Sequence, residues 1–161
     1  AQHSAGRDVK AAETYAQALE QRPDYVELIN QFALLRSQQG RVGEAIELWN
    51  RAVRLEPDNL TIRLNLGRTL AGIARHAEAL EHFDAALRSE PRNADALIGS
   101  GFALLGIARF EEGVARLEAG LQRDPDYARN MPVVIRALRE RGEVDLAARL
   151  EAAYQRAVSR R

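Results

Sequence analysis

Four prolines stand 34 residues apart along this chain of 161 residues, at Pro23, Pro57, Pro91 and Pro125. A fixed period between about 20 and 50 residues is the sequence signature of a stacked-repeat architecture. In such a protein one unit cannot bury its apolar face alone, so neighbouring units must cover it. The proline spacing therefore predicts a stack of similar units.

The residues around the prolines repeat with the same period. When units are counted from Val26, Leu60, Ala94 and Ala128, the prolines fall at unit position 32. Unit position 24 holds a large residue in four units: Tyr15, Trp49, Phe83 and Leu117. Positions 20 and 27, on either side of it, hold small residues: Ala11, Ala45, Ala79 and Gly113 at position 20, and Ala18, Ala52, Ala86 and Gly120 at position 27. We expect one domain, with a partial unit at 1–25, units at 26–59, 60–93 and 94–127, and a divergent terminal unit at 128–161.

Each unit has the pattern of two helices. In the unit at 60–93, Ile62, Leu66 and Leu70 recur at helical spacing, and a second apolar series follows. Small residues lie at the break between the two helices: Gly6, Gly40, Ala74, Ala108 and Gly142. A glycine at such a break can end a helix in the left-handed conformation. We expect nine helices and no strand, with a remnant turn and one helix before Pro23 and then four hairpins.

Two packing details follow from the repeat. Small residues at a helix crossing let paired helices approach to about 8–10 Å, so Trp49 should be buried beside Ala45 and Ala52. In the last unit, Asn130 and Pro132 predict a first helix that starts late, with Asn130 as its cap and Pro132 in its first turn.

Three segments carry this pattern most fully: GRVGEAIELWNRAVRLEPD (40–58), ARHAEALEHFDAALRSEPR (74–92) and ARFEEGVARLEAGLQRDPD (108–126). They resemble the tetratricopeptide repeat family, and the resemblance extends over essentially the whole chain. It implies an all-α fold, a right-handed α-α superhelix of helix hairpins. First helices would line a concave groove, second helices would form the convex back, and the groove would bind a peptide or protein.

Composition narrows the class of partner. The 23 basic and 23 acidic residues cancel, so nucleic acid is not an expected partner. Residues 128–161 nevertheless carry eight arginines against four acidic residues, about +4. Lys10 is the only lysine, which we interpret as the codon bias of a GC-rich bacterial genome. Cysteine is absent and no apolar run reaches the length of a membrane span, so we expect a soluble protein, cytoplasmic or periplasmic, without direct membrane insertion.

No group of residues in the sequence indicates catalysis. His76 and His82 lie about 120° apart on a helix without a carboxylate or cysteine to complete a metal site, and we expect them on the solvated surface. Glycines are scattered at turns, and no serine has a nucleophile signature. Arg7, Arg41, Arg75 and Arg109 repeat at the turn between paired helices, typical of a solvated turn. We expect no enzyme activity, cofactor or metal.

The family frame places unit positions 2, 5, 6, 9 and 12 on the groove. Its candidate residues for peptide binding are Asn30, Gln31, Leu64, Asn65, Arg68, Ile98, Phe102, Leu105, Arg136 and Arg139. The series runs from polar, through apolar at Ile98, Phe102 and Leu105, to basic, and suggests an apolar anchor with an acidic flank. The alternative is that the last unit covers these apolar residues as ordinary core.

We therefore expect a non-catalytic scaffold that binds a peptide or protein segment in its groove. One alternative is the substrate-recruiting arm of a larger enzyme, such as a glycosyltransferase. Another is a structural scaffold that self-associates through the incomplete first unit. The carboxylate clamp and the asparagine ladder known from other tetratricopeptide proteins are not expected, because only Asn65 of this chain fits either pattern.

Overall fold

The computed structural model describes the backbone of residues 2–160 and the side chains of residues 10–160. Within that part of the chain there are nine α-helices, one 3-10 helix and no strand. They are α1 (Gln2–Gln21), α2 (Val26–Gln38), α3 (Val42–Leu55), α4 (Leu60–Gly72), α5 (His76–Ser89), α6 (Ala94–Gly106), α7 (Phe110–Arg123), the 3-10 helix η1 (Pro125–Asn130), α8 (Met131–Glu140) and α9 (Val144–Val158). The expected all-α fold is confirmed.

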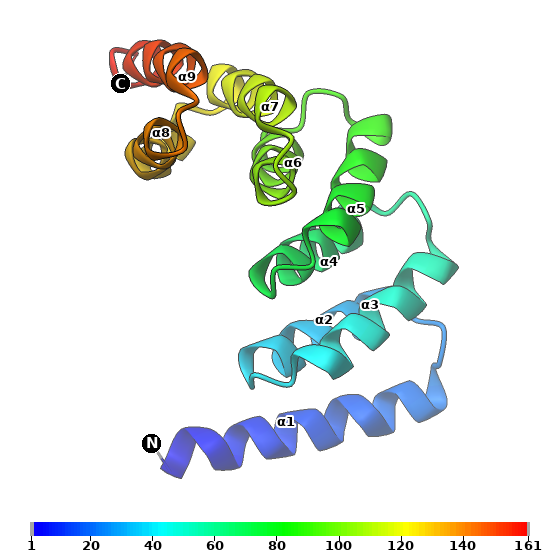
Figure 1. Ribbon diagram of the computed structural model, residues 1–161. Helices are drawn as coiled ribbons and strands as arrows, with labels where there is room; N and C mark the ends of the chain where they lie inside the picture. The colour runs from blue at the N-terminus through cyan, green and yellow to red at the C-terminus, as the bar shows by residue number, and fades with distance from the viewer. Residues whose placement is uncertain (1, 161) are drawn as a thin grey trace.

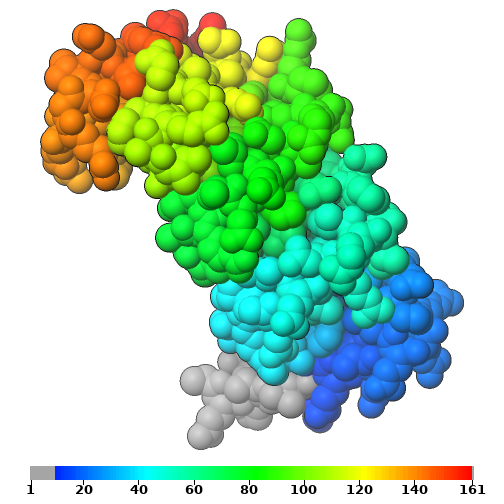
Figure 2. All heavy atoms as spheres, turned by 45° about the vertical axis from the view of Figure 1, so that its right-hand side comes forward, coloured from blue at the N-terminus to red at the C-terminus, as the bar shows by residue number. Residues whose placement is uncertain are grey.

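The helices stack in chain order into one curved array, with the two ends of the chain at opposite ends of the stack (Figure 1). The space-filling view shows the same order as successive bands of colour from blue to red (Figure 2). The first helices of the hairpins, α2, α4, α6 and α8, lie on the side toward which the stack curves in Figure 1. The architecture is therefore a superhelix of helical hairpins.

The turn between paired helices is the same in all four hairpins. Gly40, Ala74, Ala108 and Gly142 have φ values of 74°, 61°, 61° and 85°. In each turn the next residue's amide donates across the turn to a carbonyl five residues back, as from Arg75 to Leu70 at 2.9 Å. This is the Schellman arrangement, in which a left-handed residue closes the helix end. A unit position read as small in the sequence is thus a position of left-handed backbone.

The expected break at Gly6 is wrong, because α1 runs without interruption from Gln2 to Gln21. A single interior glycine lowers helix stability by about 1 kcal/mol, which weakens a helix without ending it. The remnant turn and the helix before Pro23 are one element.

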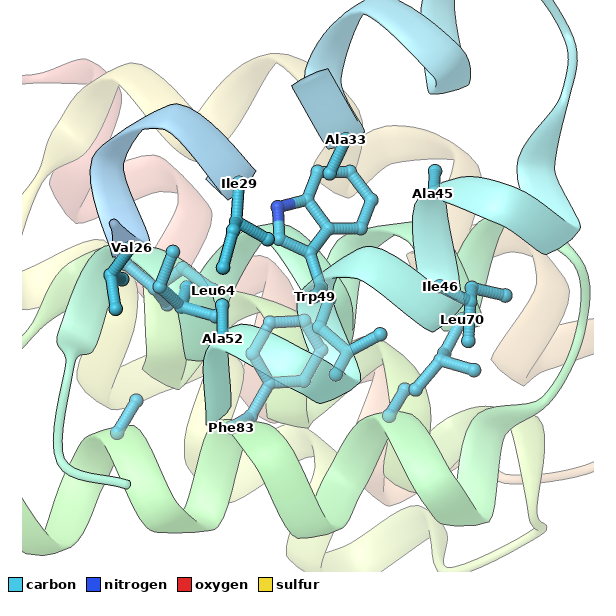
Figure 3. Packing of buried hydrophobic residues seen from close by; sticks show 14 of the residues in the cluster. Val26, Ile29, Ala33, Ala45, Ile46, Trp49, Ala52, Leu64, Leu70 and Phe83 are labelled. Carbon is cyan, nitrogen blue, oxygen red and sulfur yellow. The ribbon is translucent and has the colours of Figure 1, made fainter. Parts of the chain in front are cut away.

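Trp49 is buried between the paired helices of the first full unit, as expected, with 1% of its surface exposed. Ala45 and Ala52 on α3 are fully buried and leave room for the indole, and Ile29 and Ala33 of α2 lie close to it (Figure 3). Phe83 has the same role one unit later. A methyl group added at Gly67 or Gly99 would lie 2.9 Å or 2.5 Å from its ring, so the glycines of α4 and α6 make space for it.

The last hairpin is joined to the stack differently. α9 packs directly against α7, while η1 takes the place beside α7 that a first helix occupies in the earlier units. The cause is Pro132 at unit position 5, because its missing N–H cannot donate to the carbonyl of Ala128. The chain begins with 3-10 turns and the α-helix starts at Met131. The late start is confirmed, but the Asn130 side chain makes no capping hydrogen bond.

Candidate functional site

The candidate surface consists of the solvent-facing residues of α2, α4, α6 and α8, called here the first-helix surface. In the first three full units, unit position 5 is not on it. Asn30, Leu64 and Ile98 are only 3%, 7% and 4% exposed. The expected exposure of Ile98 is wrong, since its side chain packs toward Gly120 of α7 and belongs to the core of the C-terminal units.

Asn30 instead forms a buried polar junction between two units. Its side-chain oxygen accepts hydrogen bonds from the Trp49 indole nitrogen at 3.0 Å and from the Asn65 side-chain nitrogen at 3.1 Å. Buried polar groups are costly unless they are hydrogen-bonded, so this arrangement fixes how α2, α3 and α4 meet. Asn65 remains half-buried at the edge of the first-helix surface, and Gln31 is exposed there.

Arg68 belongs to a second cluster, which links α4, α6 and η1 across the first-helix surface. Its guanidinium lies 2.5 Å from Asp95 at the start of α6, and the hydroxyl of Tyr127 in η1 donates to the same carboxylate oxygen. Burial, together with the hydrogen bond to Asp95, raises the pKa of Tyr127 to about 12. The charge of Arg68 is therefore matched within the protein.

Tyr127 was missed from the sequence, although a signal was present. It stands at the unit position where Asn59 and Asn93 cap α4 and α6 by accepting from the amides of Ile62 and Ala96. Tyrosine cannot make that short-range cap, and its hydroxyl instead reaches Asp95 at the start of α6.

The C-terminal part of the first-helix surface is apolar and basic. Phe102 and Leu105 are half-buried and pack against the core of the last units. Val133 on α8 is 63% exposed, the largest value for a large apolar side chain in the described part of the chain. Arg136 beside it is 73% exposed, and its distance of 3.8 Å from Glu140 makes a loose ion pair. Arg139 turns away toward α9 and pairs with Glu151 at 2.5 Å.

The repeated arginines at the hairpin turns form local ion pairs. Arg41, Arg75 and Arg109 each bind the glutamate three residues later, Glu44, Glu78 and Glu112. The hydrogen bond from Arg75 lowers the pKa of Glu78, and Arg109 does the same for Glu112. Arg7 lies outside the residues whose side chains are described. The column is a feature of the turns and not of the first-helix surface.

The expectation that His76 and His82 lie on the solvated surface is wrong, because both are half-buried. The His76 ring covers Gly106 at the end of α6. The His82 ring nitrogen is 3.0 Å from the guanidinium of Arg63, and burial, together with this positive charge, lowers its pKa. Both rings pack between neighbouring helices.

Among residues 10–160, whose side chains the structure describes, no group of histidine and acidic side chains is arranged to hold a metal ion. Nor does any helix in that range combine the length and apolar character needed to cross a bilayer. The first-helix surface presents apolar area, amide groups and guanidinium groups.

Comparison with known proteins identifies the repeat. Two family models, each described as tetratricopeptide repeat, match residues 30–94 and 74–131. The chain belongs to the tetratricopeptide repeat family. Comparison with curated proteins found no match.

Solved structures share the fold along almost the whole chain. The crystal structure of MamA is 18% identical, with a TM-score of 0.82, and the match covers 98% of this chain and 92% of that one. MamA 41-end from Desulfovibrio magneticus RS-1 is 16% identical, with a TM-score of 0.81 over 98% and 89% of the two chains. YrrB, described as a TPR protein with an unusual peptide-binding site, is 17% identical, with a TM-score of 0.77 over 96% and 80%. At these identities the likeness concerns the fold.

Proposed function

We propose that this tetratricopeptide repeat protein is a non-catalytic scaffold that binds a segment of another protein on its first-helix surface. The observation that carries the proposal is the exposure of Val133 on α8, on the same surface as half-buried Phe102 of α6. Apolar side chains left in water at a basic rim mark interaction sites, because a partner's apolar side chain removes them from water.

The charges indicate the chemistry of the segment. Arg129 is exposed and has no ion pair among the described residues, and Arg136 is held only loosely by Glu140. Arginine forks suit carboxylates, while the apolar contact supplies most of the affinity. The segment is therefore an acidic one with an apolar anchor. The peptide-binding site described for YrrB supports peptide recognition on a related fold, without locating it on this chain.

The experiment selects peptides from a displayed library against the protein and then measures their binding at two salt concentrations. Phe102→Ala should weaken binding by at least about 1–2 kcal/mol, as expected of an anchor. Arg136→Glu should chiefly slow association and reduce its dependence on salt.

Val144 provides a matched control for Val133. The two valines are 60% and 63% exposed, but Val144 lies at the start of α9, outside the first-helix surface. Val133→Glu should abolish binding of the selected peptides and Val144→Glu should leave it unchanged. Equal losses at the two valines, or none at Phe102 and Arg136, refute the proposed location.

A second candidate function is self-association through the N-terminal end of the stack. Ala11 and Ala18 of α1 are half-buried, whereas Ala45 and Ala52 at the same unit positions are fully buried. Tyr25, 51% exposed, and Leu28 line a surface hollow of about 440 Å³ at this end. Sedimentation equilibrium tests it: a dimer that dissociates in Tyr25→Glu supports this candidate, and a monomer at all concentrations refutes it.

A further inference from the structure

The seam between α7 and α9 contains a cavity of about 230 Å³ that lies outside the first-helix surface. It exists because α9 packs directly along α7 in the last hairpin. Leu121, Ala153 and Ala157 form its apolar floor, each less than 5% exposed. Three arginines also line it, Arg123 at the end of α7 and Arg156 and Arg160 near the end of α9.

These three arginines have no charge partner in the part of the chain that the structure describes. Glu118 also lines the cavity and pairs at 2.9 Å with Arg149, which is shared with Glu111. The nearby C-termini of α7 and α9 contribute only about half a negative charge each. The three arginines therefore outweigh the negative charge around the cavity, which keeps a net positive charge.

We propose that this cavity binds the dianionic form of a phosphate monoester. A carboxylate carries one charge and is satisfied by a single arginine fork, whereas a phosphate monoester carries close to two charges and offers three acceptor oxygens. Three arginines that converge on one cavity match the second pattern. The phosphate belongs either to a small metabolite or to a phosphorylated side chain, since both present the same group.

The test is calorimetric titration of the intact protein at constant ionic strength with three probes. They are inorganic phosphate, a short peptide with one phosphoserine, and the same peptide without phosphate. We expect the phosphate probes to bind and the plain peptide not to bind. A phosphopeptide that binds more tightly than inorganic phosphate assigns the site to a phosphorylated segment, and equal affinities assign it to a free phosphate.

Variants localise the binding. Arg123→Gln and Arg156→Gln should each weaken it at least tenfold. The matched control is Arg88→Gln, at the same unit position as Arg156 but on α5, exposed and outside this cavity. All three changes are on exposed residues, and a thermal melt of each verifies that the fold is retained.

The charge state of the ligand gives an independent readout. Lowering the pH from about 7.5 to about 5 converts the phosphate monoester from mostly dianion to monoanion, because its second pKa is about 6. The cavity contains no histidine, so the arginines keep their charge. Binding should weaken at least fivefold. Acetate that binds as well as phosphate, or an Arg88→Gln loss equal to that of Arg156→Gln, overturns the proposal.

Discussion

The central hairpins and the last hairpin follow the same 34-residue frame but close their helices together by different means. In α3, α5 and α7, unit position 24 holds Trp49, Phe83 or Leu117, at most 1% exposed. In α9 the same position holds Glu151, which pairs with Arg139 of α8 at its half-exposed surface. At this position the last hairpin has an ion pair between its helices where the central hairpins have a buried apolar side chain. The exchange suits the end of a stack, whose outer face meets water.

At two further unit positions, α9 also lacks the large apolar residue that a central helix has. Positions 21 and 28 are large and apolar on α5, at Leu80 and Leu87, but are Ala148 and Gln155 on α9. On the central helices these residues contribute to the core between units. The 34-residue repeat therefore fixes where the helices lie. The residues at unit positions 21, 24 and 28 determine whether another helix packs against the second helix of a hairpin.

The largest effect on stability is expected at unit position 24. Trp49→Ala should cost about 3–5 kcal/mol of unfolding free energy, since it removes a fully buried indole and leaves a cavity between α2 and α3. Its counterpart Glu151→Ala should cost less than about 1 kcal/mol, because an ion pair this exposed contributes little. Urea titrations followed by circular dichroism measure both. Equal losses would show that the two positions pack alike.

An intermediate effect on stability is expected at the contact between Tyr127 of η1 and Asp95 of α6, where the last hairpin joins the central ones. Tyr127→Phe removes the hydrogen bond to Asp95 and should cost about 1 kcal/mol. The matched control is Tyr25→Phe, at the same unit position but 51% exposed, which should change stability by less than about 0.5 kcal/mol.

The pKa of Tyr127 makes the same junction visible by titration. Because the folded-state pKa is raised from 10.0 to about 12, this contribution to stability is complete below pH 10 and is lost as the pH rises toward 12. In the ultraviolet titration of tyrosinate, one tyrosine should ionise about two pH units late, and Tyr127→Phe should remove that phase. A variant that loses tyrosinate absorbance near pH 10 instead of the late phase contradicts the Asp95 contact.

The sequence was sufficient for features that depend on neighbours within one unit. Helix pairing, the burial of Trp49 and the late start of α8 follow from Ala45, Ala52 and Pro132, whose effects act over one or two turns. The sequence was insufficient where units meet. Asn30 accepts from Asn65, Arg68 is paired with Asp95, and α9 lies on α7, and each of these contacts depends on the rotation between successive hairpins. No spacing along one helix encodes that rotation. The family frame also placed three buried residues on the binding surface, and one of them, Ile98, is covered by α7 of its own hairpin.

The smallest effects on stability are expected at the turns between paired helices. The inner turns hold alanine in the left-handed conformation, at Ala74 and Ala108, while the outer turns hold Gly40 and Gly142. Left-handed backbone costs a residue with a Cβ about 1–2 kcal/mol, and glycine loses about 0.4–1 kcal/mol more through its freer unfolded chain. Ala74→Gly and Ala108→Gly should therefore each stabilise the protein by about 0.5–1 kcal/mol. Ala77→Gly, on the exposed side of α5, should destabilise it by about 1 kcal/mol. Chemical denaturation distinguishes the two signs, and destabilisation by all three changes would mean that Ala74 and Ala108 carry no strain.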